Sequence, residues 1–156
     1  MLLSSLLVLG CGEPEDTGDS PTEVDCALGQ LDEDDLFQPL DGEALELVLG
    51  FQGFLFVRTA VQVDREELVQ ASWSITLDQD TPIGGSQPAQ LRSGLSEEIL
   101  LFLPDGSVGL YEGRQASVAV RLEGRDWTCL GQGEGVLVDE DECIHTGDAP
   151  LCDTGS

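Results

Sequence analysis

An unbroken alternation of apolar and polar residues in the middle of the chain constrains its fold more than any other feature. The pattern runs from Val69 to Leu77 without interruption. Successive side chains of a β-strand point to opposite faces, so strict alternation predicts a strand with one buried and one exposed face. An amphipathic helix would instead repeat its apolar residues every three or four positions. The segment therefore predicts sheet structure packed against a core.

Shorter segments of the same character lie on both sides of this strand. Apolar residues alternate or run continuously at 45–49, 55–63, 99–103, 118–122 and 136–138. Turn-forming residues separate these segments, as at Phe51-Gln52-Gly53 and Pro104-Asp105-Gly106, and no long segment has a helical period. About seven or eight short strands joined by Gly, Pro and Asp turns predict an all-β sandwich.

The order of Cys26, Trp73 and Cys129 resembles the Cys, Trp, Cys arrangement of immunoglobulin domains. The step from Cys26 to Trp73 is much longer than in that pattern. The resemblance therefore implies architecture alone, an Ig-like antiparallel β-sandwich.

Charge divides the chain into a middle segment and two acidic flanks. The chain has 31 acidic and six basic residues and a net charge of −25. All the basic residues are arginines between Arg58 and Arg125, and the flanks contain acids alone. Blocks of like charge repel one another and stay solvated, which predicts disordered acidic termini. We expect a flexible tether at 11–23, the folded domain at 24–143 and an acidic tail at 144–156.

The first ten residues predict a targeting segment. Residues 1–10 are uncharged and rich in leucine, and an acidic run follows them. A membrane-spanning helix needs about 20 apolar residues, so this segment is too short to span a bilayer. We expect a signal peptide that is removed on export.

The sequence Val8-Leu9-Gly10-Cys11 resembles the lipobox of bacterial lipoproteins. The resemblance implies that Cys11 is acylated, becomes the N-terminus and anchors the chain in the cell envelope. In such proteins an Asp after the cysteine favours inner-membrane retention; Gly12 stands there, which implies the outer membrane. Signal peptides normally begin with basic residues, which 1–10 lack, so either the start lies upstream or export is inefficient. The alternative is an ordinary signal peptide with a chance cysteine.

Four cysteines remain besides Cys11, and an even number suits disulfides in an exported protein. If 127–130 and 134–138 form a hairpin, Cys143 lies ~20 Å beyond the residue facing Cys129, too far for a disulfide. We therefore favour Cys26 with Cys129 and Cys143 with Cys152. The alternative is that Cys143 and Cys152 are tail residues whose pairing is incidental.

Two dense carboxylate runs, at 32–35 and 139–142, suggest a calcium site. Calcium prefers several oxygen ligands, and the runs could converge if the first and last strands are neighbours. Neither run has the spacing of an EF-hand loop, and the alternative is two solvated acidic loops. The candidate ligands are Asp32, Asp34, Asp35, Asp139 and Asp141.

Enzymatic and nucleic-acid functions have little support in the sequence. The single histidine, His145, lies in the predicted tail, and no phosphate-binding loop or Cys-x-x-Cys motif is present. Paired carboxylates could hydrolyse glycosides, but so acidic a chain always offers some pair. An anionic chain also disfavours nucleic acid. We expect no catalytic residue and no required cofactor. We assign the aromatic residues Phe51, Phe54, Phe56, Trp73 and Trp127 to the core, with Trp127 on a binding face as the alternative.

The acidic Thr17-Gly18-Asp19 segment and the Gly50-Phe51-Gln52-Gly53 turn before a long strand resemble uncharacterised surface lipoproteins of myxobacteria and their relatives. This resemblance implies no activity. We expect a non-enzymatic lipoprotein used for interaction, adhesion or envelope structure, anchored in the membrane by its lipid and facing a protein or polysaccharide partner. The alternatives are a calcium-binding acidic module and a carboxylate-based hydrolase.

Overall fold

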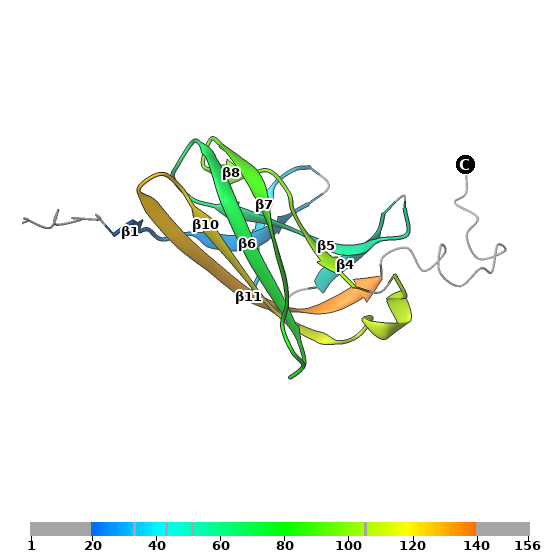
Figure 1. Cartoon of the computed structure of the whole chain (residues 1–156). Coiled ribbons are helices and arrows are strands. Elements are labelled where there is room, and N and C mark those ends of the chain that lie inside the picture. Colours follow the sequence, from blue (N-terminus) through cyan, green and yellow to red (C-terminus); the bar gives the residue numbers. More distant parts are fainter. Residues whose placement is uncertain (1–19, 33, 43, 51, 105, 140–156) are drawn as a thin grey trace, which may run out of the picture.

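The computed structural model describes residues 20–139 except 33, 43, 51 and 105 (Figure 1). This part of the chain is built from β-strands and one short 3₁₀ helix, which confirms the all-β prediction. In chain order the elements are β1 (Thr22–Glu23), β2 (Ala27–Leu31), β3 (Phe37–Pro39), β4 (Ala44–Leu49), β5 (Leu55–Gln62), β6 (Leu68–Leu77), β7 (Ile83–Arg92), β8 (Leu95–Ser96), β9 (Ile99–Leu103), η1 (Val108–Leu110), β10 (Gln115–Glu123) and β11 (Trp127–Asp139).

The strands close into a barrel. Strands β7, β6, β10 and β11 pair in antiparallel order, and β4 then joins β11 in parallel. Strand β5 pairs with β4 and is connected back to β7 through the short β8. Because this order returns to its starting strand, the Ig-like sandwich is not confirmed. Strand β9 follows β8 and also pairs with β5, with Ile99, Leu101 and Leu103 buried in the core. The β2–β3 hairpin pairs with the other end of β5.

The alternating segment forms β6, as predicted. Every second residue from Val69 to Leu77 is buried in the core. Trp73 covers Gly85 of β7, where an added Cβ would come within 2.6 Å of the indole ring. The sequence does not predict strand β7, because its glycines and Pro88 are typical of a turn. Pro88 is tolerated because this part of β7 pairs only with β6, so no second neighbour requires its missing N–H.

Strand β11 corrects the predicted hairpin. It runs without a break from Trp127 to Asp139, and the glycines expected to turn lie within it. A Cβ on Gly131 would lie 3.0 Å from the Leu28 Cβ, and a Cβ on Gly133 would lie 2.8 Å from the Leu40 Cβ. These glycines therefore admit side chains from the N-terminal segment to the inner face of β11.

The two ends of β11 pair with different strands, β1 at the start and β4 at the end. Thr22 and Glu23, which the sequence assigned to the tether, form β1 beside Trp127 and Thr128. Strand β4 pairs with the opposite end, from Val136 to Asp139, and continues into the β4–β5 turn. Thirteen strand residues span roughly 40 Å. The N-terminal attachment and the β4–β5 turn thus lie at opposite ends of the barrel (Figure 1).

Candidate functional site

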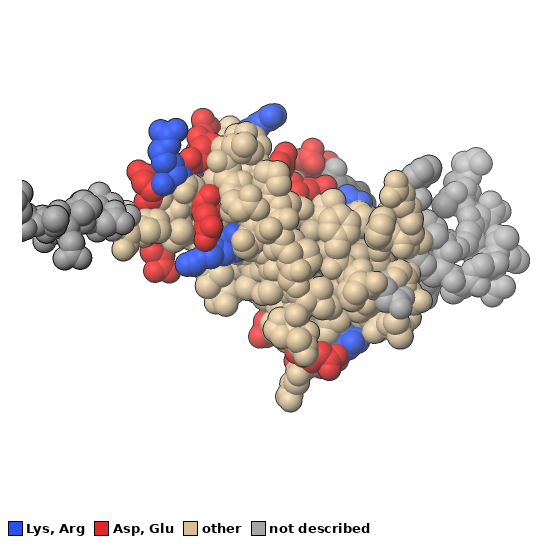
Figure 2. Space-filling view, viewed as in Figure 1, with Lys and Arg blue, Asp and Glu red and all other residues tan. Residues whose placement is uncertain are grey.

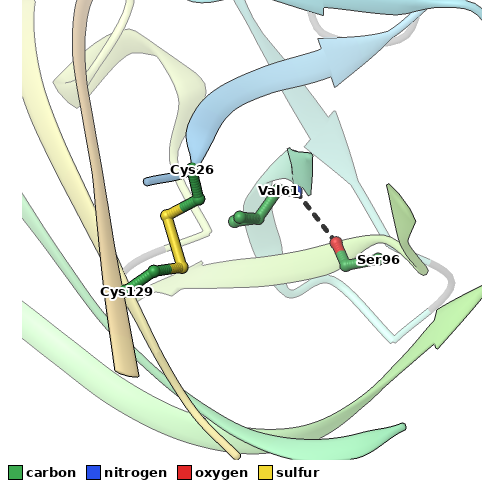
Figure 3. Close-up of a disulfide and its surroundings, with 4 residues drawn as sticks. All are labelled: Cys26, Val61, Ser96 and Cys129. Carbon is green, nitrogen blue, oxygen red and sulfur yellow. Dashed lines mark hydrogen bonds between the residues drawn. A yellow bond between two sulfur atoms is a disulfide. The ribbon is translucent and has the colours of Figure 1, made fainter. Parts of the chain in front are cut away.

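The structure joins one of the predicted cysteine pairs. Cys26 and Cys129 form a disulfide with a Cα–Cα distance of 6.0 Å across 103 residues of sequence (Figure 3). This is the favoured pairing, although the hairpin used to argue for it does not form. The other sequence-based candidates Cys11, Asp141, Cys143, His145 and Cys152 lie outside the described residues.

The surroundings of the disulfide are structural. Cys129 is buried, and the Val61 amide beside it donates a hydrogen bond of 2.9 Å to the Ser96 hydroxyl (Figure 3). The other buried polar side chain of the described core, Thr59, donates its hydroxyl to the Ile99 carbonyl. With their polar groups satisfied in this way, these residues hold β5 to the β8–β9 segment.

Asp32, the first residue of the first acidic run, accepts hydrogen bonds from the segment that connects β2 to β3. The Asp32 carboxylate accepts hydrogen bonds from the Asp34 amide at 3.0 Å, the Leu36 amide at 2.9 Å and the Gln38 side chain at 2.9 Å. The Leu36 amide is the main reason that the pKa of Asp32 is lowered, and Gln38 is the second. The carboxylate of Asp32 thus stabilises its own turn.

The expected calcium ligands do not assemble within the described part of the chain. Among residues 20–139, leaving aside those not described, no group of three or more Asp, Glu, His or Cys could hold a metal ion. Asp139 instead ends β11 opposite Leu47 of β4. The described residues of the two acidic runs therefore belong to separate local structures.

A shallow polar groove of about 450 Å³ crosses the outer face of β6, β10 and β11. Small side chains line it, and Ser117 donates a hydrogen bond of 3.4 Å to Glu134. The groove is open to solvent, and its lining offers hydroxyl and amide groups but no aromatic platform. Figure 2 shows a largely uncharged central surface, whereas charged side chains gather near the β1 end and along the upper and lower margins.

Trp127 is not on a binding face. The side chain is 2% exposed, and its indole N–H donates a hydrogen bond to the Glu67 carboxylate. The guanidinium of Arg65 lies 5.9 Å from the ring centroid. The alternative that placed Trp127 on the surface is therefore wrong, and the residue fastens the β5–β6 connection to β11.

The surface feature that stands out is an aromatic cluster, defined here as Phe54, Phe56 and Phe102. Phe54 is 56% exposed and Phe102 is 43% exposed, while Phe56 is half-buried. The Phe102 ring lies 5.7 Å from that of Phe56 and 6.4 Å, edge to face, from that of Phe54. Such geometry is typical of favourable aromatic pairs. The cluster contains three of the five phenylalanines of the chain.

The backbone fixes the aromatic cluster at the end of the barrel. Phe56 stands between Val48 of β4 and Phe102 of β9 in one row across the sheet. Phe54 closes the turn, where its carbonyl accepts a hydrogen bond of 2.7 Å from the Gly50 amide. Gly53, at a φ of +79°, permits this turn. The turn was predicted at Phe51-Gln52-Gly53, of which Phe51 lies outside the described residues. The rings are therefore held by sheet structure and a hydrogen-bonded turn.

The sequence contained the signal for this cluster, and we misinterpreted it. Leu55 and Val57 belong to the predicted strand segment 55–63, and both are buried. Phe56 lies between them, so the same alternation places it on the outer face. Assigning Phe56 to the core was wrong, and so was assigning Phe54, which is largely exposed. Phe102 was harder to place because its neighbours in β9 are all apolar, which leaves the facing of the strand undecided.

No protein-family model matches the sequence, and a search of curated proteins finds no relative. Within the described residues, no helix has the length and apolar character needed to cross a membrane.

Proposed function

We propose that this protein is a lipoprotein of the cell envelope, anchored in the outer membrane through Cys11, whose barrel is a non-enzymatic binding module. The aromatic cluster is its binding surface. Large exposed apolar groups are costly to keep in water, and a contiguous group of them is typical of an interaction site. Aromatic side chains also contribute strongly to binding because they bury large areas with few rotatable bonds.

The observation that carries this proposal is that the N-terminal segment and the aromatic cluster lie at opposite ends of the barrel. The N-terminal segment joins β11 at Trp127, and the aromatic cluster lies beyond the other end of the same strand. From Cys11 to Ser20 the chain has nine residue steps, which reach at most about 30 Å. That reach is shorter than the roughly 40 Å length of β11. An upright barrel would therefore present the cluster away from its anchor.

The disulfide adds support for an extracytoplasmic address. Cys26 and Cys129 are paired, and disulfides persist mainly in exported proteins. The bond also fastens the segment that follows the tether to β11, so a pull on the anchor is passed to the longest strand of the barrel.

Fractionation and mass spectrometry of the full-length chain, expressed in a bacterial host, test this proposal. We expect the protein in the membrane fraction, with an N-terminal peptide that begins at acylated Cys11. The Cys11→Ser variant should lose the acyl mass and leave that fraction. An unmodified Met1, or wild-type protein found only in the cytoplasm, would overturn the anchor.

A further inference from the structure

We propose that two copies of this chain join edge to edge through strand β7. Among the residues that the structure describes, β7 pairs with β6 along Ile83–Gln90 but with the short β8 only at Leu91 and Arg92. One edge of β7 therefore has no neighbouring strand over most of its length. Such an edge presents N–H and C=O groups to which another strand can add.

The backbone groups of alternate residues in β7 face this edge. Glu97 follows β8, which pairs with β7 on the side opposite to β6. The Gln90 amide donates to the Glu97 carboxylate, and the Glu97 amide donates to the Gln90 carbonyl. Because backbone groups alternate between the two sides of a strand, the N–H and C=O groups of Gly84 and Ser86 point the same way. Both residues are exposed.

The β7 edge lacks the charges that commonly prevent pairing. No charged residue lies between Asp80 and Arg92, although the net charge of the chain is −25. Natural sheets protect their edges with charged side chains or with prolines. Here prolines alone are present, Pro82 just before β7 and Pro88 within it. They confine any added strand to the segment between them.

The spacing of these prolines favours a second copy as the occupant. Pro82 and Pro88 each stand three positions from Gly85. If two β7 strands pair antiparallel about Gly85, Gly84 of each copy faces Ser86 of the other, and each facing pair exchanges two backbone hydrogen bonds. Each proline then faces a proline, where neither residue has an N–H to satisfy. Every N–H group that faces the edge in this segment is thus paired.

The centre of this joint has room for the second strand. The two Gly85 residues meet there without side chains. The Trp73 indole covers the inner face of its own Gly85, where an added Cβ would lie 2.6 Å from the ring. The two indoles would lie side by side beneath the joined strands and shield the central hydrogen bonds from water. Aromatic side chains support glycines at sheet edges in this way.

Repulsion between two acidic chains limits the affinity. The acids that precede β7, Asp78 and Asp80, are ion-paired with Arg114 at 2.8 and 2.5 Å. Repulsion from more distant acids is screened beyond about 8 Å at physiological ionic strength. The joint between Ile83 and Gln87 is also short compared with a stable interface, which buries about 1,200–2,000 Å². We therefore expect a weak dimer that added salt strengthens.

The direction of pairing has a consequence that rests on the proposed anchor. Strand β6 begins next to Glu67, which is bonded to Trp127 beside β1, and Ile83 faces Ile75 near its other end. The joint thus lies in the half of the barrel away from the N-terminal attachment. Antiparallel pairing points the two attachments in opposite directions. With both copies anchored through Cys11, the dimer would link two facing membranes.

Sedimentation velocity of the full chain with Cys11→Ser, which needs no lipid, tests the pairing. We expect a monomer–dimer equilibrium with a Kd on the order of 10–100 µM that falls as salt is raised. Ser86→Pro removes an edge-facing N–H from each copy and keeps the bonds to β6, so it should raise Kd about tenfold or more. Ser86→Ala keeps the N–H and is the matched control, which should change Kd less than about twofold.

Two outcomes contradict the pairing. One is a chain that stays monomeric at about ten times the expected Kd in about 0.5 M salt. The other is a dimer that Ser86→Pro leaves unchanged; its loss in Phe54→Ser with Phe102→Ser would assign self-association to the aromatic cluster. If Ser86→Pro lowers the melting temperature, Ser86→Glu replaces it, because it keeps the N–H and adds like charges beside the joint. Both outcomes are independent of the acylation of Cys11, which is measured by fractionation.

Discussion

The indole N–H of buried Trp127 donates a hydrogen bond to the carboxylate of Glu67, which joins β11 to the residue just before β6. Removing the acceptor leaves a buried donor unsatisfied. We expect Glu67→Ala to lower the free energy of unfolding by about 1–3 kcal/mol, and Glu67→Gln to cost less because its amide oxygen still accepts. Urea unfolding measures both. Glu112→Ala, at an exposed position on another part of the barrel, is the control and should change little. Equal stability of Glu67→Ala and the parent would show that water replaces the carboxylate.

The disulfide between Cys26 and Cys129 should contribute much of the stability of the barrel. It closes a loop across 103 residues, for which the loss of chain entropy in the unfolded state predicts about 4 to 5 kcal/mol. We expect Cys26→Ser with Cys129→Ser to shift the denaturant midpoint strongly downward. The paired substitution Cys143→Ser with Cys152→Ser is the comparison, and it should leave the Cys26–Cys129 peptide intact in non-reducing mass spectrometry. A midpoint unchanged by the first pair would contradict this account.

Gly133 should tolerate no side chain while Leu40 is present. A Cβ there would lie 2.8 Å from the Leu40 Cβ, so we expect Gly133→Ala to destabilise the protein by about 1–3 kcal/mol. Gly109→Ala is a matched control because nothing lies within 4 Å of its added Cβ. The clash also predicts coupling: Gly133→Ala should cost less in a Leu40→Ala background. Additive costs in that double-mutant cycle would mean that the glycine acts through backbone freedom alone.

Local pattern was enough to predict the strands whose two faces differ in polarity. Val69 to Leu77 alternates because one face of β6 packs on the core, so the sequence and the structure agree there. Strand β7 and the middle of β11 could not be found in this way. Gly85 is set by Trp73 of the neighbouring strand β6, and Gly133 is set by Leu40, which comes from a distant part of the chain. Closure of the barrel also could not be predicted from local pattern, because it depends on β8, which has only two residues.

The candidate site was predictable in part. The even count of cysteines predicted disulfides, whereas the pairing of Cys26 with Cys129 was argued from a hairpin that does not form. The outward position of Phe56 follows from the alternation of β5. The approach of Phe102 to Phe56 could not be predicted, because it depends on the pairing of β9 with β5 after a long excursion through β6, β7 and β8. Such non-local pairing is set by the whole fold and leaves no local pattern in the sequence.

The hydrogen bonds to the Asp32 carboxylate predict how the turn that it closes responds to low pH. Its hydrogen bonds from Leu36, Gln38 and Asp34 hold its pKa below the ordinary value of 3.8. A depressed pKa means that the ionised form stabilises the folded turn. This contribution is complete above the unfolded pKa and is lost as pH falls through the lower folded pKa. We expect an NMR titration to place the Asp32 midpoint below 3.8, and Gln38→Ala to raise it by removing one donor. Since the carboxylate is exposed, the effect on global stability should be small. Gln70→Ala, on the outer face of β6, serves as the control and should leave the Asp32 midpoint unchanged. If Gln38→Ala leaves the midpoint equal to that of the parent, the backbone amides alone lower the pKa of Asp32.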